Sequence, residues 1–332
     1  MKHNSRTFRI TGVMSIATIA AMSLAACSSP EAPQADAAGN ETAELTVLHA
    51  PINFEAVYIA EQEGFFDAEG LDVTIVPGGT AQDNLGQLAG GSADISIVSW
   101  DAAVTATAEN LPIKVISGNG IISTEVDTSG VFVRKDSGIA SVADLAGKTI
   151  AFNSVGSGGN VPVLQALRKA GVGPEQVTQV AIPFASMQTA LENSQVDAVF
   201  PSDSFYSQVK AVDGFAEISN PSREYRGGLG ITLWAVTDPW LAENAETAQK
   251  FNDAMSQAVD FYNDPANLNA IYEVRAEVTG QPVDDVKGPL VEYSLAIDPK
   301  VSQKTTDALK EFGFVENPKS VDEILWTEAP RT

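Results

Sequence analysis

The sequence predicts an α/β protein of two lobes, each built on a parallel-rich sheet flanked by helices. Short apolar strands alternate with helical segments along most of the chain, a pattern that builds parallel sheets covered on both faces. Residues 45–332 are too many for one minimal domain, and a 44% apolar composition allows sizeable cores. Residues 92–99 and 195–202 also echo each other, because both run from an aspartate through an apolar strand to a serine. We therefore expect matching positions on two facing lobes.

The elements follow from periodicity and from turn residues. We expect strands at residues 45–49, 71–76, 95–98, 114–117, 131–134, 149–152, 179–182, 198–200 and 231–236. We expect helices at residues 55–62, 82–89, 101–109, 161–170, 186–192, 204–211, 245–262, 268–278 and 302–311. The chain beyond residue 236 is therefore mostly helical.

The N-terminus has the pattern of an export signal. Lys2, Arg6 and Arg9 precede an uncharged apolar segment, residues 10–26, that is short for a membrane span. This segment ends in LAAC, which resembles the lipobox of bacterial lipoproteins and implies cleavage before Cys27 and a lipid on that cysteine. We expect a signal peptide at 1–26 and a lipid-anchored flexible tether at 27–44, which contains no aromatic residue. A soluble secreted protein and an uncleaved anchor are the alternatives.

The charge and the cysteine count exclude several classes of function. The formal net charge is −23, and removal of the signal peptide leaves 17 basic residues against 43 acidic ones, a net of −26. Such a chain is a poor partner for nucleic acid or for an anionic membrane surface. Cys27 is the only cysteine, so the sequence predicts no disulfide.

The central stretch, residues 149–171, delivers a strand into a turn rich in glycine and serine at the start of a helix. Free N–H groups at such a helix start attract anions and hydrogen-bond acceptors. The turn does not match the G-x-G-x-x-G nucleotide motif, because Val161 stands where the third glycine belongs. An ordinary α/β turn without a ligand is the alternative.

The two echoing segments place Ser99 and Ser202 at the carboxyl ends of their strands, where open α/β sheets bind ligands. Both serines would also serve as helix N-caps with no ligand at all. Asp94 and Asp197 precede their strands, at the other end of the sheet, and we interpret them as turn or capping residues.

Four segments in order resemble the substrate-binding proteins of ABC importers for nitrate, aliphatic sulfonates, taurine and thiamine pyrimidine precursors. They are GFFDAEGLDVTIV at 64–76, GGSADISIVS at 90–99, SVADLAGKTIAF at 141–152 and ALENSQVDAV at 190–199. The resemblance implies the type II periplasmic-binding-protein fold, in which two α/β lobes are joined by two crossover strands that act as a hinge. It places lobe one at 45–134 and 230–332 and lobe two at 135–229, with crossovers near 131–137 and 227–232.

In that fold the ligand lies between the strand ends and helix starts of both lobes. The resemblance therefore implies ligand-binding candidates in lobe one, namely Asn53, Phe54, Glu55, Gly79, Thr80, Ser99, Trp100 and Asp101. Those in lobe two are Ser154, Gly156, Ser157, Gly158, Asn160, Ser202, Asp203 and Tyr206, and Arg226 could reach in from the returning crossover. Hydroxyl and helix-start N–H groups suit an oxyanion, and the aromatic side chains would cover an apolar or flat body.

The acidic candidates oppose an anionic ligand. Glu55, Asp101 and Asp203 would repel it unless they accept hydrogen bonds or pair with Arg226. They would favour a cation or a donor-rich ring such as an aminopyrimidine. A zwitterion such as taurine would satisfy both kinds of group.

The expected function is an extracytoplasmic solute-binding lipoprotein of an ABC importer that binds sulfonate, taurine, nitrate or a similar solute. An aminopyrimidine thiamine precursor or another cationic or aromatic solute is the alternative. The resemblance implies delivery to a permease that is driven by a separate ATPase. We expect a monomer with no cofactor, no metal and no nucleic-acid partner.

A secreted enzyme of the same fold is the less favoured possibility. His3 and His49 are the only histidines, and His3 leaves with the signal peptide. A Ser-His-Asp triad would have to use His49, and no Gly-x-Ser-x-Gly accompanies it. The Cys-rich motif that the resemblance associates with a pyrimidine synthase of this fold is missing.

Overall fold

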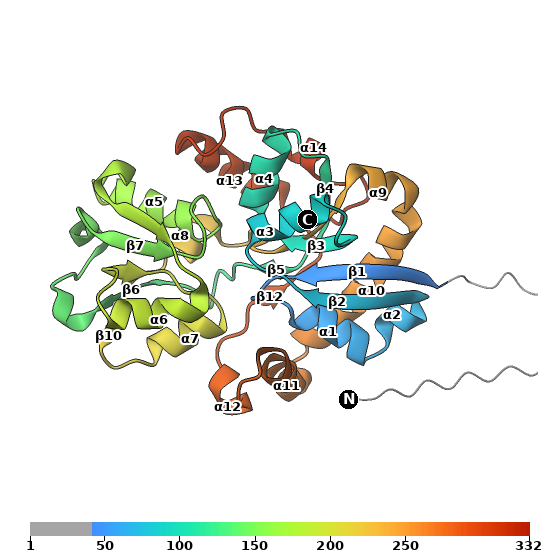
Figure 1. Ribbon diagram of the computed structural model, residues 1–332, viewed down its shortest axis with the longest axis horizontal. Helices are drawn as coiled ribbons and strands as arrows, with labels where there is room; N and C mark the ends of the chain where they lie inside the picture. Colours follow the sequence, from blue (N-terminus) through green and yellow to red (C-terminus); the bar gives the residue numbers. More distant parts are fainter. Residues whose placement is uncertain (1–41) are drawn as a thin grey trace, which may run out of the picture. The chain divides into compact units, whose positions relative to one another are not determined.

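The computed structural model describes residues 42–332, which carry two five-stranded sheets and one two-stranded sheet (Figure 1). The predicted signal peptide, Cys27 and most of the tether lie outside the described residues. Among the described residues, no helix combines the length and the apolar composition needed to cross a membrane. The predicted α/β class with parallel-rich sheets is confirmed.

Sheet one has the strand order β2-β1-β3-β11-β4. Its strands are β1 (Ala43–His49), β2 (Leu71–Pro77), β3 (Ile95–Val98), β4 (Ile113–Gly118) and β11 (Leu233–Thr237). Strand β1 is parallel to β2 and β3, whereas β11 runs antiparallel to both β3 and β4.

Sheet two has the order β10-β6-β9-β7-β8. Its strands are β6 (Val131–Arg134), β7 (Thr149–Phe152), β8 (Thr178–Ala181), β9 (Ala198–Val199) and β10 (Phe215–Ser219). Strand β7 is parallel to β8 and β9, whereas β6 is antiparallel to β9 and β10. The third sheet pairs β5 (Gly120–Ile121) with β12 (Glu292–Tyr293).

Helices cover both faces of each large sheet (Figure 1). The helices of lobe one are α1 (Glu55–Gln62), α2 (Phe65–Ala68), α3 (Ala81–Ala89), α4 (Trp100–Ala108), α9 (Asp238–Glu243), α10 (Ala245–Asn263), α11 (Leu268–Thr279), α12 (Val283–Val286), α13 (Pro299–Glu311) and α14 (Val321–Ile324). Those of sheet two are α5 (Asn160–Lys169), α6 (Phe184–Glu192), α7 (Ser204–Lys210) and α8 (Pro221–Arg226). Short 3-10 turns lie at Lys135–Ser137, Val142–Leu145, Pro174–Gln176 and Pro265–Asn267.

The two sheets repeat one frame. Val47 pairs with Ile95 in sheet one, and Ile150 pairs with Ala198 in sheet two, so both pairings join residues 48 apart. The aspartates before β3 and β9 also do the same work: Asp94 accepts from the backbone N–H of Thr46 at 2.8 Å, and Asp197 accepts from that of Thr149 at 2.9 Å. The sequence echo therefore marks a repeated β-α-β-α-β unit, and its aspartates tie neighbouring strands together.

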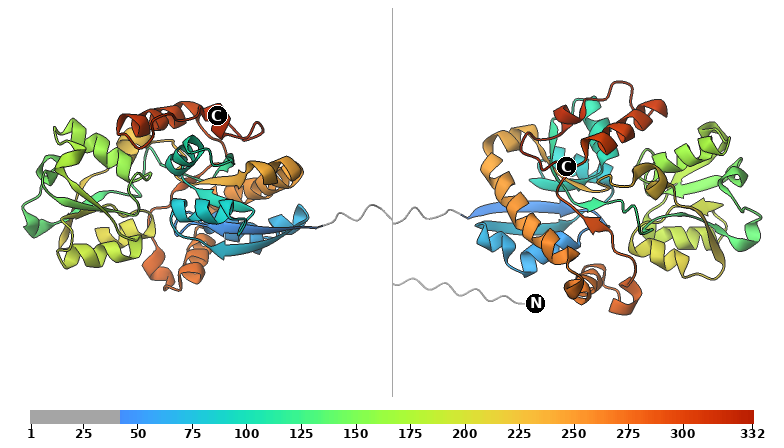
Figure 2. Two further views of the ribbon diagram at one scale, coloured as in Figure 1. Left: turned by 45° about the horizontal axis from the view of Figure 1, so that its top comes forward. Right: turned by 180° about the vertical axis from the view of Figure 1, so that it is seen from behind.

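Two crossovers connect the lobes and hydrogen-bond to each other (Figure 2). The N–H of Ile122 donates to the carbonyl of Leu229 at 2.9 Å, and that of Gly228 donates to Ile122 at 2.8 Å. Gly228 has a φ of +84°, a conformation that residues with a Cβ rarely adopt. Sliding or bending of these two strands is the motion that the connection allows.

The expected boundary at residue 134 is wrong by the length of one strand. Strand β6 was expected in lobe one, but it pairs with β9 and β10 of sheet two. The first crossover therefore spans about residues 122–130 rather than 131–137. Sequence pattern identifies β6 as a strand, but its sheet depends on partners distant in the chain. The same limit applies to β10, which was not expected.

Candidate functional site

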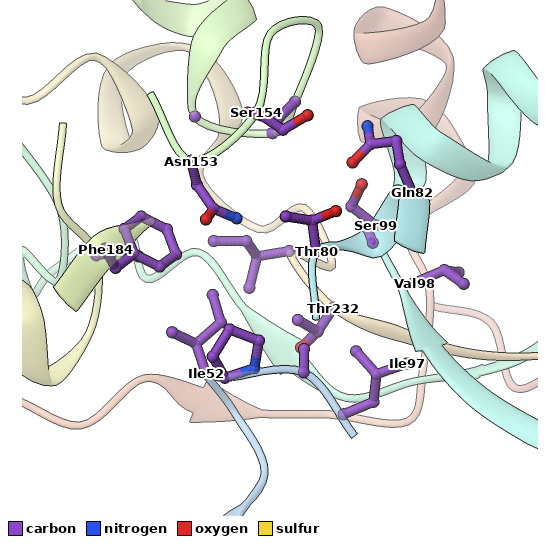
Figure 3. Close-up of a pocket in the computed structure, with 18 of the residues that line it drawn as sticks. Ile52, Thr80, Gln82, Ile97, Val98, Ser99, Asn153, Ser154, Phe184 and Thr232 are labelled. Carbon is purple, nitrogen blue, oxygen red and sulfur yellow. The ribbon is translucent and has the colours of Figure 1, made fainter. Parts of the chain in front are cut away.

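A cavity of about 70 Å³ lies between the lobes, at the carboxyl ends of parallel strands from both sheets, and we call it the cleft (Figure 3). Open α/β sheets bind ligands at this end of their strands. The residues that line the cleft are Ala50, Pro51, Ile52, Gly79, Thr80, Ala81, Gln82, Ile97, Val98, Ser99, Asn153, Ser154, Ser157, Gly158, Gly159, Phe184, Phe200, Ser202, Ile231 and Thr232.

Three helices begin at the cleft. Thr80, Ser99 and Gly159 are the N-caps of α3, α4 and α5, and all three line the cavity. The first turn of a helix has N–H groups without intrahelical partners and carries the positive end of the helix dipole. Three such helix starts favour a negatively charged or acceptor-rich group in the cavity.

Local hydrogen bonds hold these helix starts in place. Thr80 and Asp83 form a capping box, in which the N–H of Asp83 donates to the Thr80 hydroxyl at 3.2 Å and the N–H of Thr80 donates to the Asp83 carboxylate at 3.1 Å. Ser99 accepts from the N–H of Ala102 at 3.2 Å. Ser99 is therefore both an N-cap and a cleft residue, so its two interpretations are compatible.

Every side chain that lines the cleft is uncharged. Six lining residues carry hydroxyls, namely Thr80, Ser99, Ser154, Ser157, Ser202 and Thr232. In Figure 3 the side-chain amide of Asn153 points into the cavity, while Phe184 and Ile52 supply apolar walls. The cleft therefore offers hydrogen-bond donors on one part of its surface and apolar contact on another.

Seven of the predicted ligand-binding residues line the cleft: Gly79, Thr80, Ser99, Ser154, Ser157, Gly158 and Ser202. The other ten, which do not line it, are Asn53, Phe54, Glu55, Trp100, Asp101, Gly156, Asn160, Asp203, Tyr206 and Arg226. Most of these ten are buried, and their polar groups are engaged within the protein.

Asp101 and Arg226 form a buried ion pair between the lobes. Asp101 belongs to α4 of lobe one, and Arg226 ends α8, which packs on α5 of lobe two. The guanidinium donates to both carboxylate oxygens, at 2.7 and 2.8 Å, and each side chain is 1% exposed. A third bond runs from Arg226 to the carbonyl of Gly158, at 3.2 Å. This bidentate geometry neutralises Asp101 behind the cleft wall.

A second buried cluster joins the lobes through Arg275 of α11. Its guanidinium donates to Glu55 of α1 and, at 2.5 Å, to Asp203 before α7 of lobe two. The phenol of Tyr293 also donates to Glu55 at 2.7 Å. Burial raises the pKa of Asp203 to about 6; the Arg275 charge opposes this rise, and the Glu55 charge adds to it. One guanidinium therefore serves two carboxylates in this cluster.

The predicted aromatic residues belong to the hydrophobic cores. Trp100 is fully buried and donates from its indole N–H to Thr306 at 3.0 Å. Tyr206 packs edge-on against Phe132 within lobe two. Phe54 packs against Tyr58 and against His49, which contacts Tyr58 through its ring nitrogen at 3.2 Å.

Asn53 and Asn160 hold loops beside the cleft. Asn160 accepts from the N–H of Gly156 at 2.8 Å and so closes the turn before α5. Asn53 accepts from the Thr232 hydroxyl at 3.2 Å, and its carbonyl accepts from Asn119 at 2.8 Å. These residues position the cleft walls. Within residues 42–332, no cluster of three acidic, His or Cys side chains is arranged to hold a metal ion.

Sequence reasoning missed two kinds of site residue. Asn153 and Phe184 follow the ends of β7 and β8, so the rule that selected Ser99 would also have selected them. Arg275 could have been found from a different feature of the sequence. It occupies a position on α11 beside Ile271 and Val274, on the buried face of that helix, and a cation there requires a buried partner.

The comparisons with known proteins agree with this geometry. The family model described as NMT1/THI5 like matches residues 51–267. The chain is 26% identical over 254 residues to the 4-amino-5-hydroxymethyl-2-methylpyrimidine phosphate synthase of Aspergillus parasiticus, covering 72% of each.

Among solved structures, the periplasmic aliphatic sulphonate binding protein SsuA of Escherichia coli aligns with a TM-score of 0.72 and 18% identity over 87% of this chain and 94% of that one. The alkanesulfonate-binding protein SsuA of Xanthomonas axonopodis pv. citri, bound to MOPS, aligns with a TM-score of 0.71 and 19% identity over 86% and 99% of the two chains. These matches confirm the predicted two-lobe periplasmic-binding-protein fold.

Proposed function

The chain belongs to the NMT1/THI5-like family and has the fold of periplasmic solute-binding proteins, and from this premise we propose that it is the extracytoplasmic solute-binding component of an ABC importer. It binds a small solute in the cleft and delivers it to a permease that is driven by a separate ATPase. The predicted lipid on Cys27 holds it at the membrane.

The ligand class that we propose is a small organic oxyanion, with a sulfonate as the type case. The observation that carries this choice is an uncharged cleft with three helix N-caps and six hydroxyl side chains. The hydroxyls of Thr80 and Thr232 donate to Asp83 and Asn53, and the four serine hydroxyls remain to donate to a ligand. Such a site stabilises an anion by hydrogen bonds and helix dipoles without a cationic side chain. The two structural neighbours, an aliphatic sulphonate binding protein and an alkanesulfonate-binding protein, support the same ligand class.

The arginine pairs remove the main argument for a cation. Asp101 is held by Arg226, and Glu55 and Asp203 are held by Arg275, so none of these carboxylates lines the cleft. An aminopyrimidine would need acceptors for its amino protons, and the side-chain amides of Asn153 and Gln82 and the hydroxyls of the cleft are the uncharged groups that could supply them.

Binding and turnover distinguish these possibilities. We expect purified protein to gain thermal stability with taurine or an alkanesulfonate, because a ligand that binds only the native form raises the melting temperature. An aminopyrimidine and a quaternary amine in the same screen test the alternative ligands. Mass spectrometry of the recovered ligand tests the secreted-enzyme alternative, since a binding protein returns its ligand unchanged.

The first prediction concerns the two echoing serines. The Ser99→Ala/Ser202→Ala double variant should bind the sulfonate at least about tenfold more weakly, because hydrogen bonds to a charged group contribute about 1.5–3 kcal/mol each. Isothermal titration calorimetry measures the change in Kd.

Ser320→Ala is the matched control. Ser320 caps α14 as Ser99 caps α4, but it lies outside the cleft, so its loss should lower stability without changing Kd. An unchanged Kd in the double variant would refute the role of these hydroxyls.

A further inference from the structure

A second cavity adjoins the cleft and has a different lining. Its volume is about 410 Å³, compared with about 70 Å³ for the cleft. Gln82 lines both cavities, and the turn that contributes Ser154 and Ser157 to the cleft contributes Val155 and Gly156 to the second cavity. We call the second cavity the groove. Figure 3 shows the Gln82 side chain extending from α3 toward Ser154 of that turn.

The groove runs along α3 and α4, away from the helix starts at the cleft. Its walls include Leu85, Gly86 and Ala89 of α3 and Ala102, Thr105 and Ala106 of α4. From Gln82 to Ala89 a helix rises about 10 Å. Phe314 and the 43%-exposed Val155 close the groove from the other side. This lining is predominantly apolar, with Glu109 at the far end.

Gly86 is an exposed residue on the wall of the groove. It lies in the interior of α3, where glycine costs roughly 0.5–1 kcal/mol relative to alanine. A Cβ built on Gly86 would meet nothing within 4 Å, so packing inside the protein does not require the glycine. A side chain at this position would instead extend into the groove.

The cleft suits the charged head of an amphiphilic ligand, and the groove suits its apolar tail. The cleft holds the helix starts and hydroxyls that bind an anionic head, and its volume is small compared with the roughly 300–1,000 Å³ of typical ligand pockets. The groove holds the larger space and the apolar surface. An apolar chain attached to the head would pass Gln82 and lie along α3 and α4.

We propose that the groove is a subsite for the apolar tail of the ligand, so that the physiological solute is an organic anion with an extended hydrocarbon chain rather than a compact one. The inference rests on the proposed function, because it takes the cleft as the site of the anionic head. Each methylene that the groove buries raises affinity about threefold to fourfold.

The test compares ethanesulfonate with octanesulfonate by calorimetry on the purified full-length protein. The wild type binds octanesulfonate at least about tenfold more tightly. Gly86→Leu places a branched side chain in the groove and removes most of that gain, while its Kd for ethanesulfonate stays within about twofold of the wild type. Leucine favours the helix over glycine, so this variant retains its fold, and its melting temperature verifies that.

Gln87→Leu is the matched control. Gln87 is an exposed residue of α3 outside the groove, so this variant keeps the chain-length dependence of the wild type. Equal affinity of the wild type for both sulfonates, or a full octanesulfonate gain in Gly86→Leu, overturns the tail subsite while leaving the proposed function intact. Failure of both sulfonates to bind overturns the proposed function, and the tail subsite with it.

Discussion

The junctions that follow β3 and β9 are equivalent positions of one repeated frame, yet their charges are balanced differently. Each strand is preceded by an aspartate that accepts a hydrogen bond from the neighbouring strand of its sheet, and each strand ends near a serine that lines the cleft. Each junction also carries a buried carboxylate, Asp101 in lobe one and Asp203 in lobe two.

The difference lies in the ratio of acids to guanidinium groups. Asp101 has Arg226 to itself and receives two hydrogen bonds from it. Asp203 shares Arg275 with Glu55, and it adopts a φ of +55°, which is uncommon for a residue other than glycine. In both cases the arginine comes from the opposite lobe. Each junction thus pairs its carboxylate with a guanidinium. Only in lobe one does the number of carboxylates equal the number of guanidinium groups.

The largest loss of stability in this comparison is expected when Arg275 is replaced. Arg275→Met leaves Glu55 and Asp203 buried without a cation, and breaking a buried pair on one side costs about 3–5 kcal/mol. We therefore expect the free energy of unfolding to fall by at least this amount in urea titrations. Arg168→Met is the control, because the Arg168–Glu311 pair is exposed and should cost less than about 1 kcal/mol. If the two variants lost equal amounts of unfolding free energy, burial would not be what makes the Arg275 cluster important for stability.

The next effect contrasts the two aspartates. Asp101→Asn leaves Arg226 as a lone buried charge and should cost about 3 kcal/mol. Asp203→Asn should cost less, because Glu55 still neutralises Arg275 and the variant removes the surplus acid. Urea titrations at pH 7 measure both differences. If Asp203→Asn were the more costly change, the proposed imbalance between the junctions would be wrong.

The sequence predicts the frame better than it predicts these pairs. Strand–helix alternation and the echo located Ser99 and Ser202 correctly in the cleft, because both signals are local in the chain. The partners of Asp101 and Glu55 lie 125 and 220 residues away, and no local pattern connects such positions. The same carboxylates therefore read as candidate ligand groups in the sequence and as members of buried ion pairs in the structure.

The lining of the cleft was predictable to a similar degree. Residues at strand ends, such as Gly79 and Thr80, follow from the topology rule. Thr232 and Ile231 come from the returning crossover, and their approach to the cleft depends on how the two crossovers pair. Long-range pairing of this kind also decides that β6 belongs to sheet two, which is why the boundary at residue 134 was misplaced.

The last expected effect is a dependence of stability on pH at the junction in lobe two. Burial raises the pKa of Asp203 to about 6 in the folded protein, from an ordinary value of 3.8. Between these values the folded state holds a proton that the unfolded state has lost, so stability falls as the pH rises through this range. The contribution of Asp203 is therefore fully present below about pH 4 and is lost above about pH 6. Asp203→Asn cannot titrate, so subtracting its unfolding free energy from that of the wild type between pH 4 and 7 isolates the contribution. A difference that stays constant, or that grows with pH, would contradict the imbalance of charge in the Arg275 cluster.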